Sequence, residues 1–219
     1  MTLNPEESRV LGTLIEKAQT VPGSYPMTLN SLIIGCNQKN NREPVTAFDE
    51  DTVYASVDSL RKKGIVREVD LANSRVQKFR HVARDAFKVT TEELVLLAEL
   101  LLRGPQSIGA LRGNASRMTP TGLETLEQAQ ALLNALSTRE IPLVKLVPAP
   151  PGSRAALYVQ LLCPDLHIIA TGPTPSLTAA AVSSDLAERV QTLEADLEAC
   201  RAAIQRLASR LGETDPFER

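Results

Sequence analysis

The chain contains no tryptophan, and aromatic residues make up only 3% of its 219 residues. Proteins that bind single-stranded nucleic acid stack the bases on exposed aromatic rings, so the composition argues against that class. The core has to be built mainly from Leu, Val, Ile and Ala, and hydrophobic residues as a whole reach 43% of the chain. This share is ordinary for a folded protein, and the shortage of rings predicts helices with a modest amount of sheet.

Residues that commonly bind metals or catalyse reactions are also scarce, because the chain has two histidines and three cysteines. His81 and His167 are the only histidines, so we expect no zinc site. Cys36, Cys163 and Cys200 are far apart in the sequence, which indicates reduced thiols rather than a disulfide framework. Since a glycine-rich phosphate loop is missing as well, we expect a protein that is not an enzyme and binds no cofactor.

Neither sign of charge dominates: the net charge is −2, and the pI of about 5.8 excludes a globally basic DNA-binding protein. The balance varies along the chain. Residues 1–82 carry 11 Lys or Arg and 10 Asp or Glu, whereas residues 173–219 carry 5 and 8. A basic patch that meets phosphate is therefore expected in the first part of the chain rather than in its tail.

The sequence also lacks the apolar run of roughly 20 residues that a membrane-spanning helix needs. Its longest such run, residues 94–102, includes Glu99. The first seven residues show neither the basic nor the apolar region of a signal peptide. We therefore expect a cytoplasmic protein with no membrane contact.

Residues 1–84 show the order helix, helix, helix, strand, turn, strand. Asn4 and Pro5, followed by two glutamates, are typical of a helix start, and Gly64 is typical of a helix end. Helices are expected over residues 5–21, 28–36 and 49–63, and strands over residues 65–70 and 76–82. This order is typical of a winged helix-turn-helix domain.

The same pattern returns in residues 85–170. Helices are expected over residues 91–103, 107–113 and 121–137, and strands over residues 142–147 and 156–161. A shift of 86 residues aligns acidic and apolar positions of the two leading helices, for example Glu7 with Glu93 and Leu11 with Leu97. Because two copies of a pattern are stronger evidence than one, we predict an α+β, mostly α protein with two tandem winged helix-turn-helix domains, residues 1–84 and 85–170.

A linker is expected over residues 171–176, followed by a helix over residues 177–213. Apolar residues recur there at alternating spacings of four and three, as in a coiled coil. The positions are Leu186, Val190, Leu193, Leu197, Cys200, Ile204, Leu207 and Leu211. In a parallel pair Arg189 would meet Glu194, which favours a homodimer. A helix packed back on its own chain remains the alternative, because the heptad run is short.

Two stretches of the chain resemble a known family. They are Cys36-Asn37-Gln38-Lys39-Asn40-Asn41-Arg42-Glu43-Pro44-Val45 and Leu100-Leu101-Leu102-Arg103-Gly104-Pro105-Gln106. The chain resembles the YceH-like family of uncharacterised bacterial proteins over residues 3 to about 170. The resemblance implies tandem winged helices and assigns no functional residue.

Basic residues of the third expected helix are the first candidate site, since this helix occupies the position that enters the DNA major groove in helix-turn-helix proteins. Its outward residues are expected to be Asp51, Thr52, Ser56, Ser59, Lys62 and Lys63. The acidic start of the helix would repel phosphate. Its basic residues Arg61, Lys62 and Lys63 lie at the far end, where they also complement the helix dipole.

The hairpin that follows is the second candidate, because it holds Arg67, Arg75, Lys78 and Arg80. Lys78 and Arg80 share a strand face by the two-residue period. Phosphate contact requires only positive charge within reach, although an ordinary solvated strand face would have the same composition.

The third candidate is the Asn-rich loop of residues 37–45. Its polar members are Asn37, Gln38, Lys39, Asn40, Asn41 and Arg42. Amide side chains can read adenine edges and the two cations can hold phosphate. Alternatively, the same side chains satisfy backbone groups in a long structured loop.

Two functions remain open from the sequence. The first is a DNA-binding regulator or nucleoid-associated protein that acts on double-stranded DNA as a dimer. In this case basic residues of the first hairpin would contact the DNA phosphates. The second is a protein-interaction module that uses tandem winged helices as a scaffold for another protein, which the acidic pI and the apolar tail favour.

Overall fold

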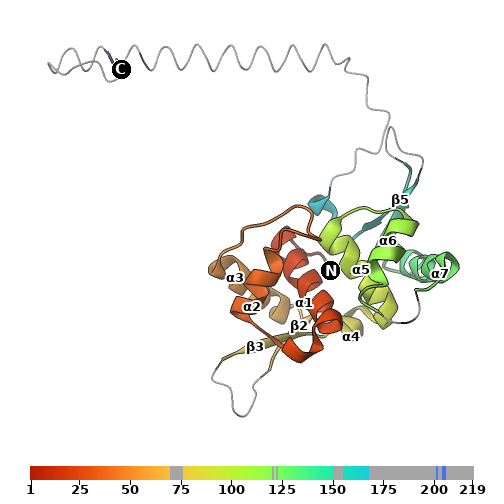
Figure 1. Ribbon diagram of the computed structural model, residues 1–219, viewed down its shortest axis with the longest axis horizontal. Coiled ribbons are helices and arrows are strands. Elements are labelled where there is room, and N and C mark those ends of the chain that lie inside the picture. The colour runs from red at the N-terminus through yellow and green to blue at the C-terminus, as the bar shows by residue number, and fades with distance from the viewer. Residues whose placement is uncertain are drawn as a thin grey trace. The chain divides into compact units, whose positions relative to one another are not determined.

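Two copies of one helix-and-hairpin pattern make up most of the described chain in the computed structural model (Figure 1). The structure describes residues 1–69, 76–119, 121, 123–149 and 155–167, together with residues 201, 204 and 205. It divides into the units Met1–Thr171 and Gly172–Arg219. In the second unit, Arg201, Ile204 and Gln205 are helical.

The first half contains four helical segments and a three-stranded antiparallel sheet. In chain order the elements are α1 (Pro5–Thr20), the 3-10 turn η1 (Pro22–Ser24), β1 (Met27–Thr28), α2 (Leu29–Cys36), α3 (Glu50–Lys62), β2 (Val66–Val69) and β3 (Lys78–His81). The strand order is β1-β3-β2, so the short strand between the first two helices pairs with the last strand.

A short helix, α4 (Ala83–Phe87), leads into the second half. Its elements are α5 (Thr91–Arg103), α6 (Ile108–Ala115), α7 (Leu126–Ser137), β4 (Val144–Val147), β5 (Leu157–Gln160) and the 3-10 turn η2 (Pro164–Leu166). β4 and β5 form an antiparallel hairpin. Gln106 makes an isolated bridge to Tyr158 of β5, as Met27 of β1 pairs with Phe79 of β3.

The helices begin where local side chains satisfy the free backbone N–H groups. The Asn4 side chain accepts a hydrogen bond from the Glu7 amide at 2.7 Å, and the Glu7 carboxylate accepts one from the Asn4 amide at 2.9 Å. Thr90 and Glu93 repeat this capping box at the start of α5. The expected start of the first helix is confirmed.

In both halves, the residue before the first strand of the hairpin donates a backbone hydrogen bond to the preceding helix. The Ile65 amide donates to the Leu60 carbonyl at 3.0 Å, and the Leu143 amide donates to the Leu136 carbonyl at 3.0 Å. The strand register agrees as well: Val66 pairs with His81 in one hairpin and Val144 with Gln160 in the other. The next pairs, Arg67–Arg80 and Lys145–Val159, are therefore equivalent positions of the two halves.

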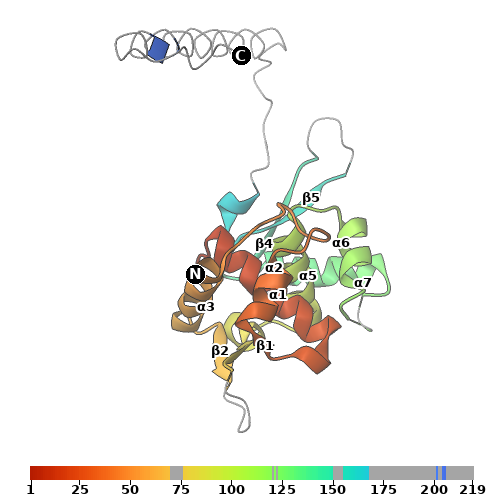
Figure 2. The same cartoon turned by 60° about the vertical axis from the view of Figure 1, so that its left-hand side comes forward.

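The two halves share one hydrophobic core, in which α1 packs against α5 (Figure 1 and Figure 2). Leu11, Leu14, Leu97 and Leu101 are fully buried in it. Gly12 permits the close approach, since a Cβ there would lie 2.9 Å from Cγ of Leu102. Both expected domains therefore lie inside one unit, and the boundary near residue 84 remains a prediction.

Several elements differ from the expectation. α7 begins at Leu126, because Thr125 and Gln128 form its capping box, rather than at residue 121. α4 and β1 were not expected. Of the heptad positions only Ile204 is described, and its side chain is 44% exposed. The other heptad residues, Arg75 and the linker of residues 171–176 lie outside the described residues.

Candidate nucleic-acid interface

The first hairpin places its cations on one face of the β1-β3-β2 sheet. Arg67 of β2 lies directly opposite Arg80 of β3, and Lys78 lies opposite Val69. Phe79, between the two cations of β3, points the other way and is buried in the core. The face turned away from the core therefore presents Thr28, Arg67, Val69, Lys78 and Arg80, which we call the outer face.

The outer face holds three cations and no acid. Within the described ranges, neither Arg67, Lys78 nor Arg80 forms an ion pair. Like charges that lie directly opposite each other on two strands destabilise the sheet. The outer face therefore carries an electrostatic cost that an anionic partner would relieve.

In contrast, the cations at the end of α3 already have partners. Lys62 lies 2.7 Å from a carboxylate oxygen of Asp58, and this contact lowers the pKa of Asp58. Arg61 lies 2.9 Å from the carboxylate of Glu68. Their charge is thus compensated within the first half.

Lys63 contacts residues at the start of α1. Its Nζ lies 2.6 Å from the carboxylate of Glu7, whose side chain is 2% exposed, and donates to the Thr2 carbonyl at 3.1 Å. Burial raises the pKa of Glu7, but hydrogen bonds from Lys63 and Ser59 outweigh it and the net pKa is lowered. Glu7 therefore stays ionised, and Lys63 is its counter-ion.

The exposed face of α3 includes Asp51 and Lys62, as the sequence predicts, but not all of the expected residues. Ser56 is only 5% exposed and donates to the Thr52 carbonyl, so its expected outward position is wrong. Ser59 points toward α1 and donates to Glu7 at 2.6 Å. Helix α3 packs against α1, and Glu50 and Tyr54, which were not among the expected residues, are exposed as well.

Arg42 of the Asn-rich loop is buried beneath α1. Its guanidinium donates to both carboxylate oxygens of Glu16, at 3.2 and 2.6 Å, and to the Gly35 carbonyl at 2.9 and 3.2 Å. Burial raises the pKa of Glu16, but the hydrogen bonds and charge of Arg42 outweigh it, and the net pKa is lowered. This guanidinium is fully engaged inside the protein.

Hydrogen bonds also hold the two ends of the loop in place. The Asn37 amide exchanges hydrogen bonds with the backbone of Phe48, both at 2.8 Å, and Gln38 accepts one from Arg42 at 3.1 Å. Lys39, Asn40 and Asn41 are exposed at the tip of the loop. These three are the members of the predicted loop site that a partner could reach.

The backbone of Glu43 connects this loop to the second half. Its amide donates to the Leu102 carbonyl at 2.8 Å, and its carbonyl accepts a hydrogen bond from Nε2 of His167 at 2.8 Å. Beside it, the Arg9 guanidinium donates to the Pro44 carbonyl at 2.5 Å. The loop that carries the family resemblance is thus a structural link between the halves.

Burial also shifts the pKa of Cys36 and of His81. Burial raises the pKa of Cys36 to about 11, which keeps it a thiol. Burial and the nearby Arg80 and Arg84 lower the pKa of His81 to about 4, so its imidazole is neutral. The described residues contain no group of three or more potential metal ligands, and none of their helices is long and apolar enough to cross a membrane.

Comparison with known proteins identifies relatives along nearly the whole chain. Residues 3–153 match the family described as "Protein of unknown function, DUF480". A UPF0502 protein of Koribacter versatilis (strain Ellin345) is 40% identical over 198 residues, 90% of this chain and 89% of the relative. UPF0502 proteins of Acidovorax sp. (strain JS42) and Shewanella pealeana (strain ATCC 700345 / ANG-SQ1) are each 39% identical, covering 96% and 94% of this chain and 94% and 99% of the relatives.

Proposed function

Because the chain belongs to the DUF480 family, whose description assigns no function, its activity has to come from its geometry, and we propose that it binds double-stranded DNA through the outer face. The single observation that carries this proposal is the Arg67–Arg80 pair, two exposed cations that lie directly opposite each other and form no ion pair with any described residue. Phosphate oxygens of DNA are partners that would compensate the repulsion between these two cations.

We further infer that both halves are winged helices, as the YceH-like resemblance implies. In support, the order α1, β1, α2, α3, β2, β3 ends in an antiparallel hairpin, and the second half repeats it with the Gln106–Tyr158 bridge in place of β1. The matching strand registers also support a duplicated domain.

Binding of this kind contacts the DNA backbone rather than the bases. The start of α3, which meets base edges in helix-turn-helix proteins, carries Glu50 and Asp51, and these acids repel phosphate. Contacts to phosphate fix the position of a protein on DNA but carry no sequence information. This favours a nucleoid-associated role over that of a sequence-specific regulator.

The test is fluorescence anisotropy of a labelled random-sequence duplex, titrated with the full chain across a salt series from about 50 to about 200 mM. Each phosphate contact contributes a slope of about −0.9 to log affinity against log salt, so Arg67→Gln with Arg80→Gln should reduce the slope by about 2. The control, Lys145→Gln, removes the cation at the position equivalent to Arg67 and should leave the slope unchanged.

The same double variant separates binding from folding. Since Arg67 and Arg80 repel each other, replacing both should leave the unfolding free energy equal to or slightly above that of the wild type, by a few tenths of a kcal/mol. Weaker DNA binding by an equally stable protein supports the proposal. Equal salt slopes for the wild type and the double variant contradict it.

A second candidate, a protein-interaction module, is favoured by the exposed face of α3. There Tyr54, 48% exposed, lies on the same helix as the exposed acids Glu50 and Asp51. Tyrosine is enriched in protein interfaces. A partner bound by this face should be recovered with the wild type and lost with Tyr54→Ala. Ile141→Ala, which removes a side chain that is 69% exposed in the second half, should retain it.

We also propose that the protein acts as a dimer through its heptad helix. Sedimentation should then give twice the monomer mass, and Leu193→Asp with Leu197→Asp should give the monomer. A monomeric wild type at micromolar concentration contradicts this part of the proposal.

A further inference from the structure

Each half has a cleft at the same place in its fold. Both clefts lie where the last strand of the half meets the end of the leading helix and the short helical segment that follows the strand. Gln19, Arg80 and Asp85 line the cleft of the first half, and Pro105, Val159 and Pro164 occupy the corresponding places in the second. Their volumes are about 230 and 310 Å³.

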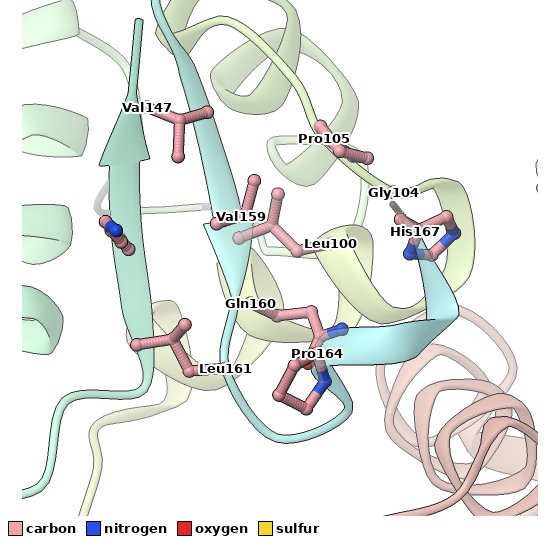
Figure 3. Close-up of a pocket in the computed structure, with 10 residues that line it drawn as sticks. Leu100, Gly104, Pro105, Val147, Val159, Gln160, Leu161, Pro164 and His167 are labelled. Carbon is pink, nitrogen blue, oxygen red and sulfur yellow. The ribbon is translucent and has the colours of Figure 1, made fainter. Parts of the chain in front are cut away.

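The two clefts differ in the charge of the residues that line them. Arg80 and Arg84 line the first cleft. Side chains from the hairpin and from the end of α5 converge on the second cleft in Figure 3. Its apolar lining consists of Leu100, Pro105, Val147, Val159, Leu161 and Pro164. The places of Arg80 and Asp85 in the first half are therefore taken by the uncharged Val159 and Pro164 in the second.

The second cleft has one lining residue with a permanent charge, Lys145. Lys145 is exposed and forms no ion pair with any described residue. Of the other two polar side chains, Gln160 exchanges hydrogen bonds with the backbone of Cys163, and His167 donates from Nε2 to the Glu43 carbonyl, while its buried Nδ1 has no hydrogen-bond partner among the described residues. Lys145 is thus the group that can pair with a ligand.

We propose that this cleft binds a small organic anion with an apolar body, of the class of medium-chain monocarboxylates. The carboxylate pairs with Lys145, and the hydrocarbon lies against Val147, Val159 and Leu161. The volume is at the lower end of the range for small-molecule sites, and such sites combine an apolar lining with few polar groups. This site is independent of the proposed DNA binding.

Calorimetric titration of the full chain with octanoate, and with octan-1-ol as its neutral analogue, tests the proposal. Lys145→Gln should weaken octanoate roughly threefold to tenfold and leave octan-1-ol unchanged, because only the carboxylate loses a partner. The control Lys39→Gln removes an exposed cation elsewhere and should change neither. Val159→Trp fills the cleft and should abolish the binding of both compounds.

Methyl NMR shifts of Val147 and Leu161 on addition of octanoate to the wild type provide a second readout that does not depend on the folding of Val159→Trp. Shifts confined to the cleft support the site. Failure of the wild type to bind octanoate, as would follow if residues 168–219 or a second copy filled the cleft, overturns the proposal. Binding that is unchanged in both Lys145→Gln and a folded Val159→Trp also overturns it.

Discussion

Arg42 and Glu16 form a bidentate ion pair beneath α1, in which the arginine side chain has no solvent exposure and the shorter contact is 2.6 Å. The two residues are 26 positions apart in the sequence and fasten the Asn-rich loop to the first helix. The stability of the first half should therefore depend on a residue of a loop.

Arg42→Ala should lower the free energy of unfolding by about 3–5 kcal/mol, because it leaves the Glu16 carboxylate buried without its counter-ion. Arg42→Lys should also destabilise, since an ammonium cannot reproduce the planar contacts to Glu16 and Gly35 together. Urea unfolding measures both. Lys39→Ala, in the exposed tip of the same loop, should change stability by less than about 0.5 kcal/mol.

Glu99 should make stability depend on pH in the opposite sense to Glu16. Burial raises the pKa of Glu99, although Arg103 opposes the shift. Its neutral form therefore stabilises the fold below the unfolded pKa, and that contribution is lost as pH rises through the raised folded pKa. Glu99→Gln, which is always neutral, should be more stable than the wild type at pH 7.

This difference in unfolding free energy should vanish below about pH 4, where Glu99 is protonated in both states. Urea titrations at several pH values provide the comparison. The exposed Glu140→Gln should show no such convergence. A wild type that is more stable than Glu99→Gln at pH 7 would mean that the ion pair with Arg103, at 3.2 Å, outweighs burial.

Gly104 should not tolerate a side chain. It has a φ of +75°, and a Cβ there would lie 2.6 Å from Cδ2 of the His167 ring. Gly104→Ala should cost about 1–3 kcal/mol from the backbone conformation alone. In a His167→Ala background the loss should be smaller by about 0.5 kcal/mol or more, since the ring contact is gone.

Thermal unfolding of the two single variants and the double variant measures this coupling. Gly109→Ala is the matched control, because its Cβ would meet nothing within 4 Å and it lies inside α6. It should stabilise the protein by about 0.5–1 kcal/mol. Strictly additive effects of Gly104→Ala and His167→Ala would argue against the contact.

Lys63 and Lys62 are neighbours with different roles. Lys63→Met should lower the unfolding free energy by about 1.5–3 kcal/mol, because the buried Glu7 loses its charged donor. Lys62→Met should change it by less than about 1 kcal/mol, since the pair with Asp58 is exposed. Equal effects of the two changes in urea unfolding would contradict this assignment.

Local features of the sequence predicted the start of α1, because its capping box at Asn4 acts within four residues. The caps of the second half were placed less well, since Thr90 rather than Thr91 caps α5 and α7 begins at Leu126 rather than at residue 121. α4 and β1 are too short to show periodicity, and the sequence analysis missed them. The burial of Ser56 and the Arg42–Glu16 pair depend on how α3 and the loop pack on α1. Such packing is decided by contacts distant in sequence, which periodicity does not contain.

In the candidate site, too, one feature was predictable from local sequence and another depends on residues that are distant in the sequence. The two-residue period placed Lys78 and Arg80 on one strand face. That Arg67 lies opposite Arg80 depends on the register between two strands, which the turn geometry and the buried residues set together. The chemical contrast between the two clefts became visible only once the registers of both hairpins were known.

The hydrogen bonds of the Glu43 backbone to Leu102 and His167 join the Asn-rich loop of the first half to the second half, in addition to the core that the halves share. A duplex bound along the outer face would have to adapt its own curvature to the sheet. Bending DNA costs energy that varies with the base sequence. A protein without base contacts would in that way still prefer flexible stretches of a genome.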